Sequence, residues 1–199
     1  MINSKEFEKN ILLCGVGGQG TVLASKLIAA TAMRQNLKVY SAETIGMAQR
    51  GGSVTSHIRI GEKAYSPLLP KGSADVIMAF EPAEAVRNLA YLKKDGLVIV
   101  NSIPVKPVTE SLVNTGYDGT EMIEYLKKNC NCIVADAEEL CKGYSLKFLN
   151  IAMLGILIGT GITGLEEKEV IEEIKAKIKP DFVDSNIEVL KRGIIYNQN

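Results

Sequence analysis

The first part of the chain changes from strand-like to helix-like spacing of its apolar residues. Residues 10–14 form a short apolar run that glycine ends, which is typical of a buried parallel strand. Apolar residues recur at helical spacing over 21–35, and a second strand pattern follows over 37–42. This strand, glycine loop, helix and strand predict the beginning of a doubly wound α/β fold.

The rest of the chain continues this alternation. Residues 43–52 are polar and glycine-containing and predict a loop, whereas 53–60 alternate and predict a half-exposed antiparallel strand. Further strands are expected at 75–80, 97–101 and 132–135, and helices at 119–128, 137–142, 145–158, 166–178 and 181–195, with another beginning at Pro82. The predicted fold class is α/β: one Rossmann-like domain over residues 1–199, with a doubly wound, mostly parallel sheet and a helical C-terminal third.

Charge and hydropathy narrow the classes of partner. Lys+Arg and Asp+Glu both number 23, so no strong overall field attracts nucleic acid or an anionic membrane. The charged N-terminus lacks the apolar stretch of a secretory signal. The most apolar region, 148–162, is shorter than the ~20 residues that span a bilayer and includes polar residues. We expect a soluble cytoplasmic protein without nucleic-acid or membrane partners.

The cysteines and the single histidine do not form a metal or catalytic pattern. Cys130 and Cys132 are close in sequence, but their C-x-C spacing lacks the second pair that zinc sites or iron–sulfur clusters need. Cys14 and Cys141 stand apart, and we expect all four to be buried apolar residues or inert thiols. His57 completes no nucleophile–base set. Because the cysteines and this single histidine make no metal or cluster site, any electron carrier is expected on another chain.

A glycine-rich loop follows the first predicted strand. Gly15, Gly17, Gly18, Gln19 and Gly20 stand in a G-x-G-x-x-G match directly before a predicted helix. Glycines let the backbone approach a ligand closely, and the N–H groups at a helix start attract phosphate. The alternative is that these glycines only permit tight strand–helix packing.

Two known glycine motifs can be compared with this loop. Thr21 directly follows Gly20, where a P-loop requires lysine, so an NTPase is not favoured. A dinucleotide site needs an acid at the end of the second strand to bind ribose. Glu43, 23 residues after Gly20, stands at such a position, so dinucleotide binding remains an open alternative.

The predicted second loop carries an arginine followed by two glycines, in the run Gln49, Arg50, Gly51 and Gly52. Arginine on such backbone is suited to gripping phosphate, carboxylate or an acid of a partner chain. A solvated arginine in a glycine turn is the alternative. In a doubly wound sheet this loop is expected beside the first glycine loop, at the carboxyl edge where ligands bind.

Two smaller groups of polar residues have simpler interpretations. His57 and Arg59 share the polar face of a predicted strand and indicate a cross-strand pair or an interface contact. Glu81 and Glu84 flank Pro82 and are expected to cap or charge a helix N-terminus.

Three segments together resemble the gamma subunit, or gamma domain, of 2-oxoacid:ferredoxin oxidoreductases: ILLCGVGGQGTVLASKLIA, AETIGMAQRGGSVTSHIRIG and DVIMAFEPAEAVRNL. The stretch GMAQRGGSV is most similar to the small (beta) subunit of indolepyruvate ferredoxin oxidoreductase. NIAMLG at residues 150–155 and N-x-x-x-L-x-x-G at 186–193 extend the resemblance over nearly the whole chain.

This resemblance implies a gamma-domain fold and a non-autonomous subunit of an oxidoreductase. The complex would convert a 2-oxoacid, coenzyme A and oxidised ferredoxin to acyl-CoA, carbon dioxide and reduced ferredoxin. Thiamine diphosphate and the iron–sulfur clusters would belong to a large partner subunit. The resemblance places Gly15, Gly17, Gly18, Gln19 and Gly20 on the nucleotide side of coenzyme A, and Gln49, Arg50, Gly51 and Gly52 toward the ligand or catalytic subunit.

Thr21 and Glu43 complete the set of predicted ligand-binding residues. Two other functions remain open at this point. One is a stand-alone Rossmann-type dinucleotide-binding protein or NAD(P)-dependent oxidoreductase, which Glu43 would support. The other is a structural scaffold subunit whose glycine loop only packs.

Overall fold

The computed structural model describes residues 7–45, 52–106 and 116–196. Its centre is a six-stranded sheet in the order β2-β3-β1-β4-β5-β6. The strands are β1 (Lys9–Val16), β2 (Val39–Ile45), β3 (Ser53–Ile60), β4 (Ala74–Ala79), β5 (Leu92–Asn101) and β6 (Asn131–Ala135).

Most of the sheet is parallel. β1, β4, β5 and β6 pair in parallel, whereas β3 is antiparallel to both of its neighbours, β1 and β2. The predicted fold class and the antiparallel strand over residues 53–60 are therefore confirmed. The strand order adds that β3 lies between β1 and β2, which the sequence pattern did not predict.

The predicted loop over residues 43–52 is wrong at its beginning. β2 continues to Ile45 because it pairs with β3 from Val39 opposite Ile60 to Ile45 opposite Val54. Polar residues are tolerated there because an antiparallel strand can face water on one side. Tertiary pairing thus extends a strand that local sequence would end.

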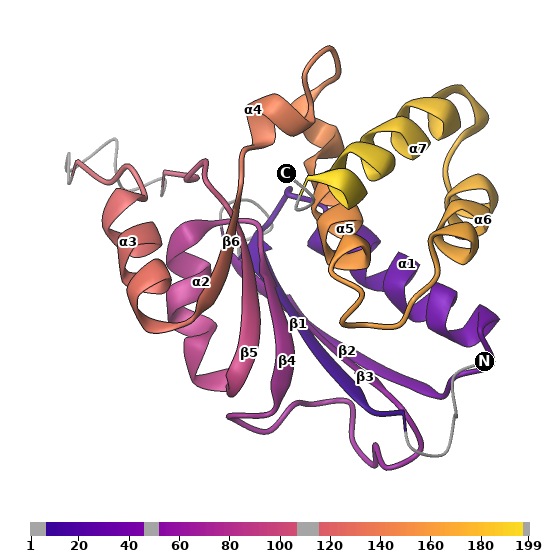
Figure 1. Ribbon diagram of the computed structural model, residues 1–199, viewed down its shortest axis with the longest axis horizontal. Helices are drawn as coiled ribbons and strands as arrows, with labels where there is room; N and C mark the ends of the chain where they lie inside the picture. Colours follow the sequence, from indigo (N-terminus) through magenta and orange to yellow (C-terminus); the bar gives the residue numbers. More distant parts are fainter. Residues whose placement is uncertain (1–6, 46–51, 107–115, 197–199) are drawn as a thin grey trace.

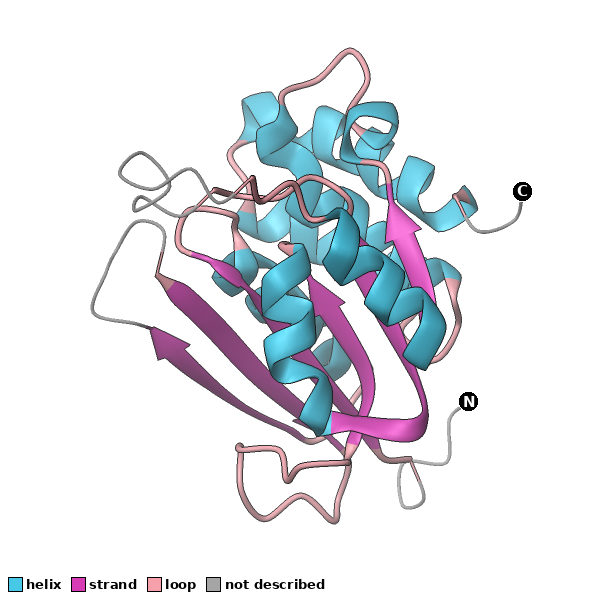
Figure 2. Ribbon diagram, turned by 90° about the vertical axis from the view of Figure 1, so that its left-hand side faces the viewer, coloured by secondary structure: helices cyan, strands magenta, loops and turns pink. Residues whose placement is uncertain are grey.

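Helices cover both faces of the sheet (Figures 1 and 2). α1 (Thr21–Arg34), α5 (Leu149–Gly159), α6 (Glu167–Lys177) and α7 (Pro180–Ile195) lie on one side, and α2 (Pro82–Asn88) and α3 (Thr120–Asn129) lie on the other. Alternate residues of each strand divide between two cores: Leu13 packs in the first and Leu12 in the second. Short elements complete the chain: η1 (Leu89–Tyr91), α4 (Ala137–Leu140) and η3 (Leu146–Phe148).

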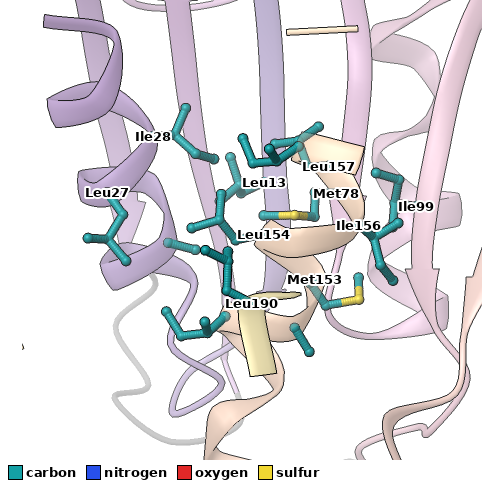
Figure 3. Packing of buried hydrophobic residues seen from close by; sticks show 14 of the residues in the cluster. Leu13, Leu27, Ile28, Met78, Ile99, Met153, Leu154, Ile156, Leu157 and Leu190 are labelled. Atoms are coloured by element: carbon teal, nitrogen blue, oxygen red, sulfur yellow. The ribbon is translucent and has the colours of Figure 1, made fainter. Parts of the chain in front are cut away.

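α5 is buried on all sides between the sheet and α7. Leu154 and Leu157 pack toward Leu13 and Met78 of the sheet (Figure 3). On the other side, a Cβ at Gly155 would lie 2.1 Å from the Leu190 carbonyl oxygen, and one at Gly193 would lie 2.1 Å from that of Ala152. The backbones of α5 and α7 touch at these glycines. This contact explains the position of the glycine in the motifs NIAMLG and N-x-x-x-L-x-x-G.

His57 is more enclosed than the predicted polar strand face suggests. It is buried, and its Nδ1 accepts a hydrogen bond from the Leu69 N–H at 3.2 Å. Its ring meets that of Tyr91 edge-on, and burial lowers its pKa. Arg59 does make the predicted cross-strand contact, because its Nε donates to Asn10 Oδ1 at 3.2 Å.

Within the described ranges, every helix is too short or too polar to cross a bilayer.

Candidate functional site

The glycine loop connects β1 to α1 at the carboxyl end of the central strand. Gly18 has φ +102° and Gly20 has φ +80°, a left-handed region that side chains rarely adopt. Gly20 is the N-cap of α1, whose first turn contains no acidic residue. The loop therefore presents the positive end of a 14-residue helix dipole to whatever lies beside it.

The Gln19 side chain holds the loop against the sheet. Its Oε1 accepts a hydrogen bond from the Val16 N–H at 2.8 Å, and its Nε2 donates to the Phe80 carbonyl at 2.8 Å. Gly15 must lack a side chain because a Cβ there would lie 2.7 Å from Gln19 Oε1. Gln19 thus shapes the loop.

Thr21 begins α1 but does not face solvent. It is buried, and its Oγ1 has no partner among the described residues. A Cβ added to Gly15 would lie 3.3 Å from that oxygen, so the hydroxyl points toward the start of the loop.

The second glycine segment meets the first. The Gly17 N–H donates to the Gly52 carbonyl oxygen at 2.9 Å. The structure thereby brings Gly52 to the glycine loop, whereas Gln49, Arg50 and Gly51 lie outside the described residues.

Glu43 does not stand where a dinucleotide-binding acid would. It lies within β2, exposed and opposite Ser56 of β3. Since β3 separates β2 from β1, Glu43 is on the second strand away from the glycine loop, not the neighbouring one. This order removes the geometric basis for the dinucleotide alternative.

A cleft of about 530 Å³ opens beside the glycine loop. Its lining contains Gly18, Gln19 and Gly20, the apolar side chains of Leu23, Ile103, Val105, Ala137, Leu146 and Leu149, and the polar side chains of Asn101, Lys147 and Asn150. Over its described lining the cleft is therefore mainly apolar, and that lining includes one lysine and a helix N-terminus as positive features.

Asn101 is the buried polar group of this cleft. It ends β5 and is 2% exposed, and its Nδ2 donates to the Phe80 and Ile103 carbonyls at 3.1 Å and 3.0 Å. Those two acceptors fix the amide orientation and leave Oδ1 without a partner among the described residues. A buried acceptor without a donor is energetically costly, and this oxygen has almost no solvent-accessible surface.

Asn150 joins α5 to the loop. Its Nδ2 lies 3.5 Å from the Gly20 carbonyl oxygen, and a Cβ on Gly20 would lie 2.6 Å from that nitrogen. Sequence reasoning singled out neither Asn101 nor Asn150 as a site residue. A signal for each was present, because both are asparagines at the edge of an apolar run.

Two buried carboxylates, Glu81 and Glu84, lie at the start of α2. Glu81 caps α2 as predicted, because the Glu84 N–H donates to its Oε2 at 2.9 Å. Tyr117 donates to Glu81, and burial together with this bond raises the pKa of Tyr117. Glu84 accepts from Ser53 Oγ at 2.7 Å and pairs with Arg87. These groups satisfy one another and link β3 to α2.

The described cysteines are free thiols. Cys14 is buried, and burial, followed by the nearby Glu84 and Glu81, raises its pKa well above the ordinary value. Burial also raises the pKa of Cys132 to about 11. Over the described ranges, no three His, Cys, Asp or Glu residues are grouped so that they could hold a metal ion.

Known proteins resemble this chain over nearly all of its length. The family model of pyruvate ferredoxin/flavodoxin oxidoreductases matches residues 10–196. The indolepyruvate oxidoreductase subunit IorB of Archaeoglobus fulgidus is 41% identical, with 95% of this chain and 94% of that protein covered.

Solved structures share the fold. The pyruvate oxidoreductase subunit PORC of Thermotoga maritima has a TM-score of 0.69 at 23% identity, covering 94% of this chain and 95% of that one. A 2-oxoglutarate:ferredoxin oxidoreductase from Magnetococcus marinus has a TM-score of 0.71 at 21% identity, covering 94% of this chain but 30% of that longer one. The resemblance predicted from the sequence is confirmed, and the chain belongs to the pyruvate ferredoxin/flavodoxin oxidoreductase family.

Proposed function

We propose that this chain is the small subunit of a 2-oxoacid:ferredoxin oxidoreductase, inactive alone, and that indolepyruvate is the 2-oxoacid of the complex. The observation that carries the proposal is the 41% identity to the Archaeoglobus fulgidus subunit, spread over 95% of this chain and 94% of its relative. Because nearly all of both chains aligns, the likeness is not confined to the glycine motif.

The complex would oxidise and decarboxylate a 2-oxoacid, transfer the acyl group to coenzyme A and pass two electrons to ferredoxin. When bound to the large partner subunit, thiamine diphosphate supplies the decarboxylation chemistry and iron–sulfur clusters supply the electron path. The residues described here fit this division, since the thiols of Cys14 and Cys132 are held protonated by burial rather than presented as ligands.

The role of this chain would be to bind and orient coenzyme A. The α1 N-terminus and Lys147 provide positive potential beside an apolar cleft, which suits a ligand with phosphates and a long aliphatic arm. The related Magnetococcus marinus enzyme is described with coenzyme A and succinyl-CoA bound, which supports coenzyme A handling by complexes that contain this fold.

The second glycine segment would face the ligand or the catalytic subunit. Gly52 supports this placement, because its carbonyl accepts the Gly17 N–H of the first loop. Arg50, two residues earlier, would then reach a phosphate or an acid of the partner.

Substrate preference tests the finer part of the proposal. The complex with its thiamine-binding partner is assayed for viologen-dye reduction with indolepyruvate, phenylpyruvate and pyruvate, each with and without coenzyme A. We expect the highest kcat/KM for indolepyruvate and dependence on coenzyme A. A preference for pyruvate would contradict the indolepyruvate assignment while leaving the subunit role in place.

A further inference from the structure

A second hollow adjoins the cleft at the glycine loop, on the side of the sheet that α1, α5, α6 and α7 cover (Figure 1). It measures about 520 Å³, and its lining includes Leu23, Lys147, Lys177, Ile178, Lys179 and Phe182. It therefore extends from the first turn of α1 to the turn between α6 and α7, and we call it the α6–α7 groove. Leu23 and Lys147 also line the cleft, so the groove and the cleft are neighbours.

The charged residues in the described lining of this groove are all lysines. Lys147, Lys177 and Lys179 line it, and none of its described lining residues is acidic. Lys177 is paired outside the groove, with its Nζ 3.5 Å from Glu173 Oε2. Lys147 and Lys179 make no ion pair with any described residue. The groove therefore carries uncompensated positive charge and should attract carboxylates.

Apolar side chains are exposed in and beside the groove. Leu23 and Phe182 line it, and Phe182 is 50% exposed. Leu146 and Val105 are exposed as well and continue the apolar surface into the neighbouring cleft. Exposed apolar side chains that gather next to charged ones are typical of a protein–protein interface, whose centre is apolar and whose rim is polar.

The buried polar side chains of the groove already have partners within the fold. Asn186 Nδ2 donates to the Phe182 carbonyl at 2.6 Å, and Asn150 Nδ2 lies 3.5 Å from the Gly20 carbonyl oxygen. The groove thus offers a partner apolar surface and ammonium groups. This combination favours a protein segment with apolar and acidic side chains over a small anion, which would leave the apolar surface uncovered.

We propose that the α6–α7 groove is a docking site for the thiamine-binding large subunit, which places an acidic segment with an apolar side chain in it. The apolar side chain packs on Phe182 and Leu23, and the carboxylates pair with Lys177 and Lys179. The position of the groove supports this occupant, because a catalytic partner has to reach the cleft that the groove adjoins. This inference rests on the proposed function and adds the surface and the chemistry by which the two subunits meet.

Association of the full chain with the large subunit tests this docking site. Calorimetric titration measures the dissociation constant Kd for the unaltered chain and for two test variants, Lys177→Gln/Lys179→Gln and Phe182→Ala. Circular dichroism melting checks that each variant is folded. If Phe182→Ala does not fold, the lysine variant still decides the question, because both lysines are exposed.

The matched controls lie on α3, on the other side of the sheet (Figure 1). Lys127→Gln/Lys128→Gln removes two exposed lysines, and Tyr125→Ala removes an aromatic side chain that is 49% exposed. The controls therefore match the test variants in lost charge and in lost exposed aromatic surface.

Both test variants should bind the large subunit about tenfold more weakly, and both controls should stay within about twofold of the unaltered chain. The Kd of the lysine variant should also depend less on salt between about 0.05 M and 0.3 M. Once each complex is saturated, the KM values for coenzyme A and ferredoxin should be unchanged, because the groove contacts the partner and not a soluble substrate.

Three results would overturn the docking site and leave the proposed function standing. One is an equal loss of association in test and control variants. Another is unchanged association with a raised KM for coenzyme A or ferredoxin, which would assign the lysines to a soluble ligand or to the electron acceptor. The third is a dimer of this chain alone that Phe182→Ala dissociates, which would assign the groove to a second copy. An assembled complex without 2-oxoacid oxidation would instead contradict the proposed function and leave the docking site in place.

Discussion

At the residue scale, the shape of the glycine loop depends on one carbonyl group. The Phe80 oxygen accepts from Gln19 Nε2 at 2.8 Å and from Asn101 Nδ2 at 3.1 Å. Two amide side chains, one from the loop and one from β5, therefore meet at the end of β4. Each is fixed by this bond, so the loop and the cleft wall keep one relative position.

Gln19→Glu tests this arrangement directly. The carboxylate keeps the size and the acceptor of Gln19 but cannot donate to Phe80, so two oxygens would face each other in a half-buried site. We expect a loss of about 2 kcal/mol in the free energy of unfolding, measured by urea denaturation. Asn131→Asp, the same change at an exposed position, should cost less than about 0.5 kcal/mol. Equal effects of the two changes would show that the Gln19 bonds do not hold the loop.

His57 makes stability depend on pH with a definite sign. Burial lowers its pKa below the ordinary value of 6.5, so the unfolded chain takes up a proton at a pH where the folded chain does not. The contribution of His57 to the free energy of unfolding should be constant above about pH 6.5. It should decrease as the pH falls below 6.5 toward the lowered pKa that His57 has in the folded chain. Denaturation midpoints between pH 5 and pH 8 measure the effect, with the pH range kept narrow to limit other titrations.

His57→Gln is the matched variant, since a glutamine oxygen can still accept from the Leu69 N–H. The part of the pH dependence that comes from His57 should vanish in it. An unchanged slope below pH 6.5 would assign that dependence to other groups.

Sequence reasoning located the glycine loop but not the direction of its side chains. The G-x-G-x-x-G spacing predicts a turn before a helix, and the structure has that turn. It cannot show that Gln19 bonds Phe80, which is 61 residues away. Asn101 was missed for the same reason, because its two acceptors and its unpaired oxygen are properties of packing.

At the element scale, α5 and α7 are joined by a contact between backbones. Gly155 and Gly193 face each other, and each leaves room for a carbonyl of the opposite helix. Gly159 continues the contact, with a Cβ there only 2.3 Å from the Ile194 carbonyl oxygen. These backbone contacts fix the position of α5 between the sheet and α7.

Gly155→Ala separates packing from helix propensity. Propensity alone would stabilise the helix by about 1 kcal/mol. The added Cβ would lie 2.1 Å from the Leu190 oxygen, so we expect instead a loss of about 3 kcal/mol as the helices are forced apart. Guanidinium denaturation measures the difference. Gly143→Asn, at a left-handed turn with no atom within 4 Å, is the control and should cost about 1 kcal/mol or less. A stabilised Gly155→Ala chain would contradict the packing account.

Hydrophobic periodicity predicted the type and approximate position of these elements. It did not predict which elements lie next to each other. The strand over residues 53–60 has the predicted bounds and type, and a helix begins at Pro82 as predicted. The position of β3 between β1 and β2 was not predictable, because it depends on long-range pairing. That position decides the interpretation of Glu43, which sequence spacing alone left as a ribose-binding candidate.

At the scale of the whole molecule, the fold places several polar features around the cleft beside the first glycine loop. The α1 N-terminus at Gly20, Asn101 and Lys147 all line that cleft. The buried carboxylates of Glu81 and Glu84, by contrast, accept hydrogen bonds within the fold, and burial raises the pKa of the Cys14 thiol well above its ordinary value. This distribution fits a subunit that positions a ligand for chemistry performed by its partner.

Complementation tests this central claim most directly. Ferredoxin reduction with indolepyruvate and coenzyme A is measured for this chain, for the thiamine-binding large subunit and for the two together. We predict full activity only in the mixture, saturating at a fixed ratio of the two chains. Ferredoxin reduction by this chain alone, or undiminished coenzyme A-dependent turnover by the large subunit without it, would contradict the account.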